Sequence, residues 1–205
     1  MKEMIELNED ERDCLQELMN IAYGSASSAI ADIIDAFATL AIPNIEIISV
    51  KDLKNYLNSQ LTQTQHFVGS QLINGDFNGE NLFIIDKNSA VNLSKEFELV
   101  HAGELSDEEV GDIVLEITNI LSSATISSLI EEMHSYASFS PPSISLIANA
   151  NELEDNLLEY YEKVIIISTK LNFEEQNIYG HLLMLASDES INYIKTALNK
   201  ILEEY

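Results

Sequence analysis

Residues 13–43 read DCLQELMNIAYGSASSAIADIIDAFATLAIP, and residues 112–142 read DIVLEITNILSSATISSLIEEMHSYASFSPP. An aspartate, a glutamate, an asparagine and a proline recur between the two stretches at a constant offset of 99 residues. These positions are Asp13, Glu17, Asn20 and Pro43 in the first copy, and Asp112, Glu116, Asn119 and Pro142 in the second. Since the whole chain contains only three prolines, two of them in register indicate a tandem duplication.

The polar members of the pattern fall on one face of a helix. At about 100° per residue, Asp13, Glu17, Asn20 and Gly24 lie within about 60° of one another. The apolar residues lie opposite: Leu15, Leu18, Met19 and Ala22 in the first copy, and Val110, Val114, Ile117 and Leu121 in the second. We therefore expect the acid and the amide to point outward. In either copy alone an ordinary solvated face would explain the pattern, whereas the repeated register with a matching proline favours a function.

At these residues the chain resembles the CheC family of chemotaxis phosphatases (CheC, CheX and FliY), which is marked by this Asp/Ser, Glu, Asn, Pro arrangement. Two copies in a chain of this length make it most similar to members of the two-site CheC type. The resemblance spans essentially all 205 residues. There is one departure from the family pattern: Gly24 is matched in the second copy by Ser123.

Composition limits the class of protein. A chain that is 46% hydrophobic can bury a sizeable core, and we expect one domain over residues 1–205, made of repeats at about 8–97 and 106–202. The formal charge of −25 disfavours nucleic acid and anionic membranes as partners, because both are bound by clustered cations. The single cysteine, Cys14, is expected to be a partly buried hydrophobic residue. With no apolar run that reaches the length of a membrane span and no secretory signal, the sequence favours a cytoplasmic protein.

Each half is predicted to run helix, strand, variable element, strand, strand, helix. Helical periodicity is expected from Asn8 through Phe37, with Gly24 permitting a bend or a close helix contact, and from Ser106 onward, where Ser106 and Glu109 form a capping box. The predicted strands are 44–50, 65–73, 81–85, 143–148, 163–173 and 178–186, and the remaining helices are 52–58, 87–97 and 189–202, with 151–158 a helix or loop and 101–105 a linker. Short turns between successive strands favour antiparallel pairing. The expected fold is therefore α+β, a pseudo-two-fold tandem repeat with one antiparallel sheet of about six strands covered by helices, which the resemblance also implies.

Other site types are disfavoured. The alternation of Asp76, Asn78 and Glu80 begins like a calcium loop, but the required glycine and distal acid are missing, so a hairpin turn explains it better. The four histidines are scattered, which makes a zinc site improbable and predicts surface or capping roles for them. Nucleotide-binding and serine-hydrolase motifs are absent from the sequence.

The resemblance implies a role for each residue of the pattern. Asn20 and Asn119 would enter the active site of a phosphorylated response regulator, such as phospho-CheY, and orient the attacking water. Glu17 and Glu116 would anchor the docking through a salt bridge to a lysine of the regulator. Asp13 and Asp112 would be supporting contacts, while Pro43 and Pro142 would end the helical segments and set the approach of the next strand. The regulator's own Mg²⁺ would activate the phosphate, so no cofactor of this chain is expected.

Two alternatives remain open. The chain could be a non-catalytic binding module for a response regulator or for a CheD-type deamidase. It could also be a duplicated domain whose pattern serves a structural purpose, since fold does not fix function.

Overall fold

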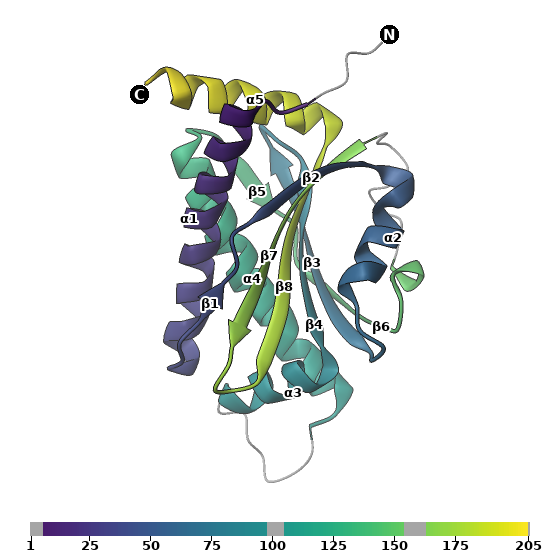
Figure 1. The fold of residues 1–205 in the computed structure, drawn as a ribbon. Helices are drawn as coiled ribbons and strands as arrows, with labels where there is room; N and C mark the ends of the chain where they lie inside the picture. Colours follow the sequence, from purple (N-terminus) through teal and green to yellow (C-terminus); the bar gives the residue numbers. More distant parts are fainter. Residues whose placement is uncertain (1–5, 98–104, 154–162, 205) are drawn as a thin grey trace.

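The computed structural model describes residues 6–97, 105–153 and 163–204. Figure 1 shows a curled sheet with long helices along one side and a shorter helix on the other. The elements are, in chain order, α1 (Glu9–Ile34), β1 (Thr39–Leu40), β2 (Asn44–Ser49), α2 (Val50–Gln60), β3 (His66–Gly75), β4 (Gly79–Asp86), α3 (Lys87–Glu96), α4 (Asp107–Glu132), β5 (Ala137–Phe139), β6 (Ser143–Ile147), the 3₁₀ turn η1 (Ala150–Glu152), β7 (Lys163–Phe173), β8 (Ile178–Ser187) and α5 (Asp188–Glu203).

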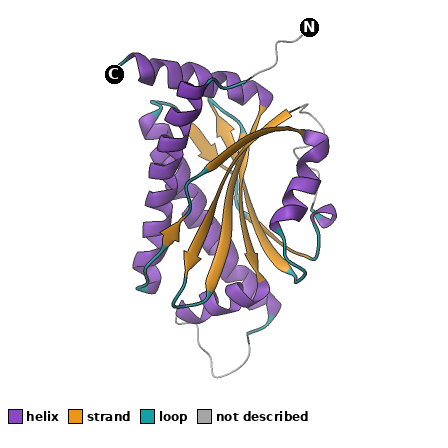
Figure 2. Cartoon of the chain, in the orientation of Figure 1, coloured by secondary structure: helices purple, strands orange, loops and turns teal. Residues whose placement is uncertain are grey.

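The sheet interleaves the two halves of the chain. Two long hairpins, β3–β4 and β7–β8, meet through antiparallel pairing of β4 with β8 at the centre. The short strands β1 and β2 of the first half then pair with β7 of the second half, and β5 and β6 of the second half pair with β3 of the first. Each half therefore completes the sheet edge of the other half, and the strands of Figure 2 form one continuous eight-stranded sheet.

Helices cover both faces of this sheet. The larger core lies under α1 and α4, where residues such as Met19 and Ile117 pack in one cluster with the inward side chains Phe83 and Ile165. A smaller core lies on the opposite face, where α2 contributes Leu53 and Leu57. The α+β fold with an antiparallel sheet covered by helices is therefore as the sequence predicts.

Helices α1 and α4, which carry the repeated pattern, begin with the same capping arrangement. The side chain of Asn8 accepts a hydrogen bond from the Glu11 amide while the Glu11 carboxylate accepts one from the Asn8 amide, a capping box. Ser106 and Glu109 form the same reciprocal pair at the start of α4, as predicted. Such caps satisfy amide groups that have no partner within the helix. They fix where each helix begins and hence which residues of the pattern face outward.

The ends of these helices differ from the prediction. α1 ends at Ile34, with Asp35 in the left-handed conformation, so Phe37 lies beyond the helix. α4 ends at Glu132. Short strands, β1 and β5, follow before the prolines are reached, and Pro43 and Pro142 directly precede β2 and β6. The prediction that these prolines end the helices is wrong, because each helix has already ended several residues earlier.

Helix α4 also corrects an expectation about apolar length. It is long and apolar enough to meet the criteria for a membrane span by length and composition. Half of its most apolar window is buried inside the fold. The close approach of α4 to the sheet explains this burial: a Cβ added at Gly69 of β3 would overlap the Thr118 side chain of α4.

Candidate functional site

The first copy of the pattern lies on the solvent face of α1. Asp13, Glu17 and Asn20 are not buried, while Leu15 and Met19 on the opposite side are completely buried. Among the residues that the structure describes, none of the three polar side chains makes a hydrogen bond or an ion pair. The carboxylate of Glu17 and the amide of Asn20 are therefore free to contact another molecule.

Gly24 continues this face but does not mediate a close contact. Apart from its chain neighbours and the backbone of α1 itself, a Cβ added at Gly24 would have no described atom within 4 Å. The expected role of Gly24 in a tight helix contact is therefore wrong for this fold. A side chain is accommodated at the matching position of α4, where Ser123 is half-buried.

The second copy has the same orientation on α4, with one difference. Asp112, Glu116 and Asn119 are exposed. Asn119, unlike Asn20, is tied to the protein, because the Gln71 amide of β3 donates to its Oδ1 at 3.0 Å. The same Gln71 nitrogen donates to the Ser140 carbonyl at 2.9 Å. Gln71 is 3% exposed and its own Oε1 has no partner among the described residues.

Each proline lies beside its motif helix for a different reason. In the first half, Gln16 of α1 donates to the Pro43 carbonyl at 2.6 Å, and Arg12 donates to the Ile45 carbonyl at 2.7 Å. Pro43 itself is buried. In the second half the link runs through Gln71, which joins Asn119 to the residue just before Pro141 and Pro142. In both halves the segment before the second strand is therefore held close to the helix turn that carries the pattern.

Exposed apolar side chains accompany the first copy. Ile21, next to Asn20, is 45% exposed, and Ile42, next to Pro43, is 76% exposed. In the second copy Ile120 is half-buried and packs against the core. The surroundings of the two asparagines therefore differ, although their helix positions match.

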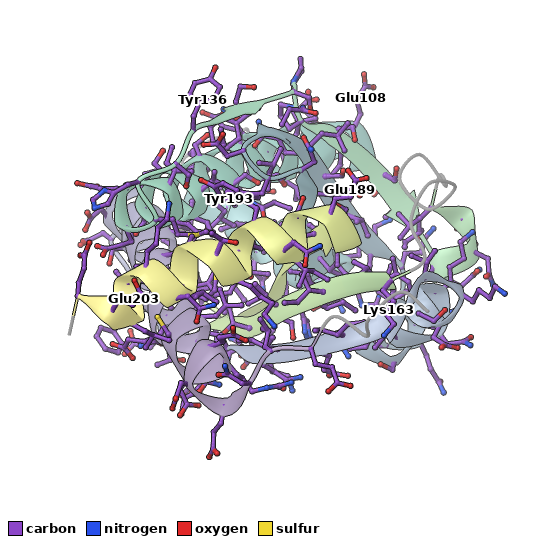
Figure 3. All side chains as sticks on the ribbon, turned by 90° about the horizontal axis from the view of Figure 1, so that it is seen from above. Glu108, Tyr136, Lys163, Glu189, Tyr193 and Glu203 are labelled. Carbon is purple, nitrogen blue, oxygen red and sulfur yellow. The ribbon has the colours of Figure 1, made fainter. Side chains whose placement is uncertain are left out.

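The charge of the surface is strongly acidic. Figure 3 shows the exposed acids Glu108, Glu189 and Glu203 around the end of the molecule that α5 crosses. On the same side the Tyr193 hydroxyl donates to the Asp76 carboxylate, which also accepts the Tyr136 backbone amide at 2.8 Å. Asp76 lies in the turn between β3 and β4, where the sequence predicts a hairpin. A small pocket lined by Tyr23, Asn81 and Leu121, among others, lies between the helices and the sheet.

Two further predictions can be compared with the structure. Cys14 is half-buried against the core, and burial raises the pKa of its thiol, as expected for a structural cysteine. His66 is not a surface residue: it is 3% exposed, and burial lowers its pKa. Within the described ranges, no group of three or more His, Cys, Asp or Glu side chains is arranged to hold a metal ion. His101 and most of residues 151–158 lie outside the described ranges.

Sequence reasoning missed Gln16 and Gln71. Neither belongs to the repeated pattern, because the matching positions in the other half are not glutamines. Gln71 did carry a signal: it interrupts the apolar, inward-facing positions of a strand, and a polar residue there needs a partner. The identity of that partner depends on how β3 lies against α4.

What this arrangement can do is limited but specific. A carboxamide can donate and accept hydrogen bonds at one position, and so can orient a water molecule. A carboxylate one helical turn away can pair with a cation of another protein. Neither group can by itself activate a phosphate or supply a nucleophile. The rest of a reaction centre would have to come from the bound partner.

No protein-family model matches the chain. The CheY-P phosphatase CheC of Bacillus subtilis is 23% identical over 204 residues, covering 94% of this chain and 95% of that protein. The chain is therefore similar over nearly its whole length to a member of the CheC/CheX/FliY family. The flagellar motor switch phosphatase FliY of the same organism is 21% identical over 182 residues, which cover 84% of this chain but only 45% of that relative.

Solved structures of proteins named FliY, FliM and CheX share the fold of this chain. The structure of Thermotoga maritima FliY covers 95% of the chain with a TM-score of 0.75 and 19% identity, over 98% of that structure. The middle domain of FliM from H. pylori has a TM-score of 0.60 and 13% identity, covering 93% of the chain and 99% of that domain. A chain of the CheX–CheY–BeF₃–Mg²⁺ complex from Borrelia burgdorferi has a TM-score of 0.52 and 12% identity, covering 81% of this chain and 96% of that one. At these identities the likeness establishes the shared fold.

Proposed function

We propose that this protein hydrolyses the aspartyl phosphate of a response regulator such as phospho-CheY. The observation that carries the proposal is the repeated outward placement of a glutamate and an asparagine, three residues apart, on α1 and again on α4. Both pairs are exposed, which suits contact with another protein's active site. The name of the B. subtilis relative, a CheY-P phosphatase, supports the same substrate.

The division of labour follows from what each protein provides. The regulator contributes the phosphorylated aspartate, its Mg²⁺ and a cationic side chain, which together stabilise charge on the phosphoryl oxygens. This chain contributes Asn20 or Asn119, whose carboxamide holds a water in line with the phosphorus. The water oxygen forms a bond to phosphorus as the bond to the aspartyl oxygen breaks. The products are the free carboxylate and inorganic phosphate, and the proton of the water leaves with the phosphate.

The acidic residues act in binding. Glu17 and Glu116 each lie one turn before the asparagine and would pair with a lysine beside the regulator's phosphorylation site. Asp13 and Asp112 extend the same acidic face by one more turn. Because these groups are at the surface, their pairing with a partner should weaken as salt rises. The formal charge of −25 adds to the attraction of a basic partner surface.

The test is phosphate release from a purified phosphorylated regulator with Mg²⁺ present. We expect the Asn20→Ala/Asn119→Ala double variant to lose its acceleration by about 100-fold or more, the scale of a lost positioning effect. Each single variant should keep the activity of the other site. Asn192→Ala, which changes an exposed asparagine on α5, is the matched control and should keep the rate of the unaltered protein. A double variant as fast as the unaltered protein would remove both asparagines from the mechanism.

A binding module without meaningful hydrolysis is the second candidate. It is favoured by the shared fold of H. pylori FliM, which is seen in a complex with FliG. Stable binding of the phosphorylated regulator, with no faster loss of its phosphate, would support this candidate instead. Binding of a CheD-type deamidase is an expectation of the family resemblance, which a pull-down with a purified CheD-type protein would test. Location in the cytoplasm is an expectation from the sequence.

A further inference from the structure

The two asparagines are matched in sequence but not in hydrogen bonding. We propose that Gln71 is a positioning residue that fixes the orientation of the Asn119 carboxamide, so that the second site is pre-organised and the first is not. This inference rests on the proposed function for its effect on rate, whereas the positioning itself can be measured without any activity.

The orientation of both amides is determined by a carbonyl group. The Ser140 carbonyl can only accept, so the Gln71 atom that lies 2.9 Å from it must be the nitrogen. The second N–H of that nitrogen then points to Asn119 at 3.0 Å. Asn119 must present Oδ1 there, because two N–H groups facing one another would repel. The Nδ2 group of Asn119 and one lone pair of its Oδ1 are left facing away from Gln71, available to a water or a phosphoryl oxygen.

The first half contains the same backbone acceptor but a different donor. Ala41 lies 99 residues before Ser140, and its carbonyl accepts a 2.6 Å hydrogen bond from the Thr169 hydroxyl of β7. A hydroxyl has one O–H, and here it is used by Ala41, whereas a glutamine amide has two N–H groups. Thr169 therefore cannot also donate to Asn20. Asn20 accordingly has no hydrogen bond to any described residue.

Burial makes the Gln71 contact persistent. Gln71 is 3% exposed, so water competes little for its amide. The only described hydrogen-bond partners of its side chain are Asn119 and Ser140, since its Oε1 is unpaired. Loss of the Asn119 contact would leave a buried N–H without a partner, which is unfavourable. Ordering the carboxamide in advance also removes part of the entropy that positioning the attacking water in the transition state would otherwise cost.

The rate test isolates the second site. In an Asn20→Ala background, Gln71→Leu should lower kcat about 3- to 10-fold, the cost of ordering one side chain, and leave KM unchanged. Thr169→Val in an Asn119→Ala background is the matched control, and it should keep the first-site rate because the Thr169 hydroxyl donates to Ala41 and not to Asn20. A double-mutant cycle completes the test: Gln71→Leu should cause no further loss when Asn119 is already alanine. The proposal would be overturned if Gln71→Leu left the second-site kcat unchanged. It would also be overturned if Gln71→Leu lowered kcat equally in the Asn20→Ala and Asn119→Ala backgrounds.

A second measurement is independent of catalysis. The side-chain ¹⁵N–¹H₂ resonances of Asn119 should have a high order parameter in the unaltered protein and a low one in Gln71→Leu, while those of Asn20 are mobile in both. Equal mobility of the two asparagines in the unaltered protein would refute the positioning, whatever the phosphatase assay gives. If the order parameters differ as expected but no phosphate is released, the proposed function fails and the positioning stands.

Discussion

The side chain of Gln16 and the carbonyl of Pro43 are joined by a 2.6 Å hydrogen bond, which ties the N-terminal third of α1 to the segment that enters β2. Gln16 directly precedes Glu17, so the bond holds the motif proline beside the exposed face of the helix. The matching residue of the second half is Leu115, which has no donor. The two halves therefore hold their prolines by different groups.

Gln16→Leu should make the first half resemble the second at this point. We expect the free energy of unfolding to fall by about 1 kcal/mol, the usual net value of one hydrogen bond. The measurement is equilibrium urea denaturation, with Gln63→Leu, at an exposed position without a described side-chain hydrogen bond, as the control. A Gln16→Leu protein as stable as the unaltered chain would show that the bond contributes nothing in solution.

Local signals were sufficient to predict most of the elements. Asn8 and Ser106 marked the starts of α1 and α4, since caps act within one turn of the helix. The long strands followed from their apolar content. The strands β1 and β5 were missed because they have only two and three residues, and each exists through pairing with a hairpin of the other half. A short stretch of sequence does not show which distant strand it will pair with.

The same reasoning explains what could be predicted of the site. The outward direction of Glu17 and Asn20 follows from helical periodicity alone, and in the structure neither is buried. The contact of Gln71 with Asn119 joins residues 48 positions apart. It depends on the register of β3 under α4, which in turn depends on Gly69 lying against Thr118. A contact of this kind follows only from the assembled fold.

Gly24→Ala should stabilise the protein. Gly24 is inside α1, where glycine costs about 0.5–1 kcal/mol relative to alanine, and its backbone is helical. An added methyl group meets no described atom within 4 Å. We expect the midpoint of urea denaturation to rise accordingly. If the added methyl group also impairs turnover of a phosphorylated regulator, Gly24 serves the approach of the partner; a fall in stability would contradict the open space seen on this face.

Gly69→Ala should do the opposite. The added Cβ would overlap the Thr118 hydroxyl oxygen and lie under 3 Å from two further atoms of that side chain. Overpacking of this kind costs about 1–3 kcal/mol, because either β3 or α4 must move. Combining it with Thr118→Ala should recover part of the loss, since the hydroxyl and methyl groups are removed while the Cβ stays. Thermal denaturation of both variants and of Thr118→Ala alone measures this; an undiminished loss in the double variant would place the clash elsewhere.

Glu80→Gln should change the pH dependence of stability. Glu80 lies on β4, where burial raises the pKa of its carboxyl above the ordinary 4.5, an effect that the hydrogen bond donated by Ser70 opposes. Between 4.5 and the higher pKa of the folded state, the folded chain binds the proton more tightly than the unfolded chain does. The free energy of unfolding therefore falls as pH rises through this window, and the loss persists at neutral pH.

Glutamine cannot ionise, so the variant should escape this loss. It should be more stable than the unaltered protein at pH 7, and the difference should vanish below about pH 4.5, where Glu80 is protonated in both states. Urea denaturation of both proteins from about pH 4 to about pH 8 gives the difference directly. Ser70→Ala is the matched comparison: it removes the bond that favours the ionised carboxyl and should steepen the fall with pH, whereas in the Glu80→Gln background it should leave the pH dependence unchanged. Parallel stability curves for Glu80→Gln and the unaltered protein would mean that water reaches this carboxyl in solution.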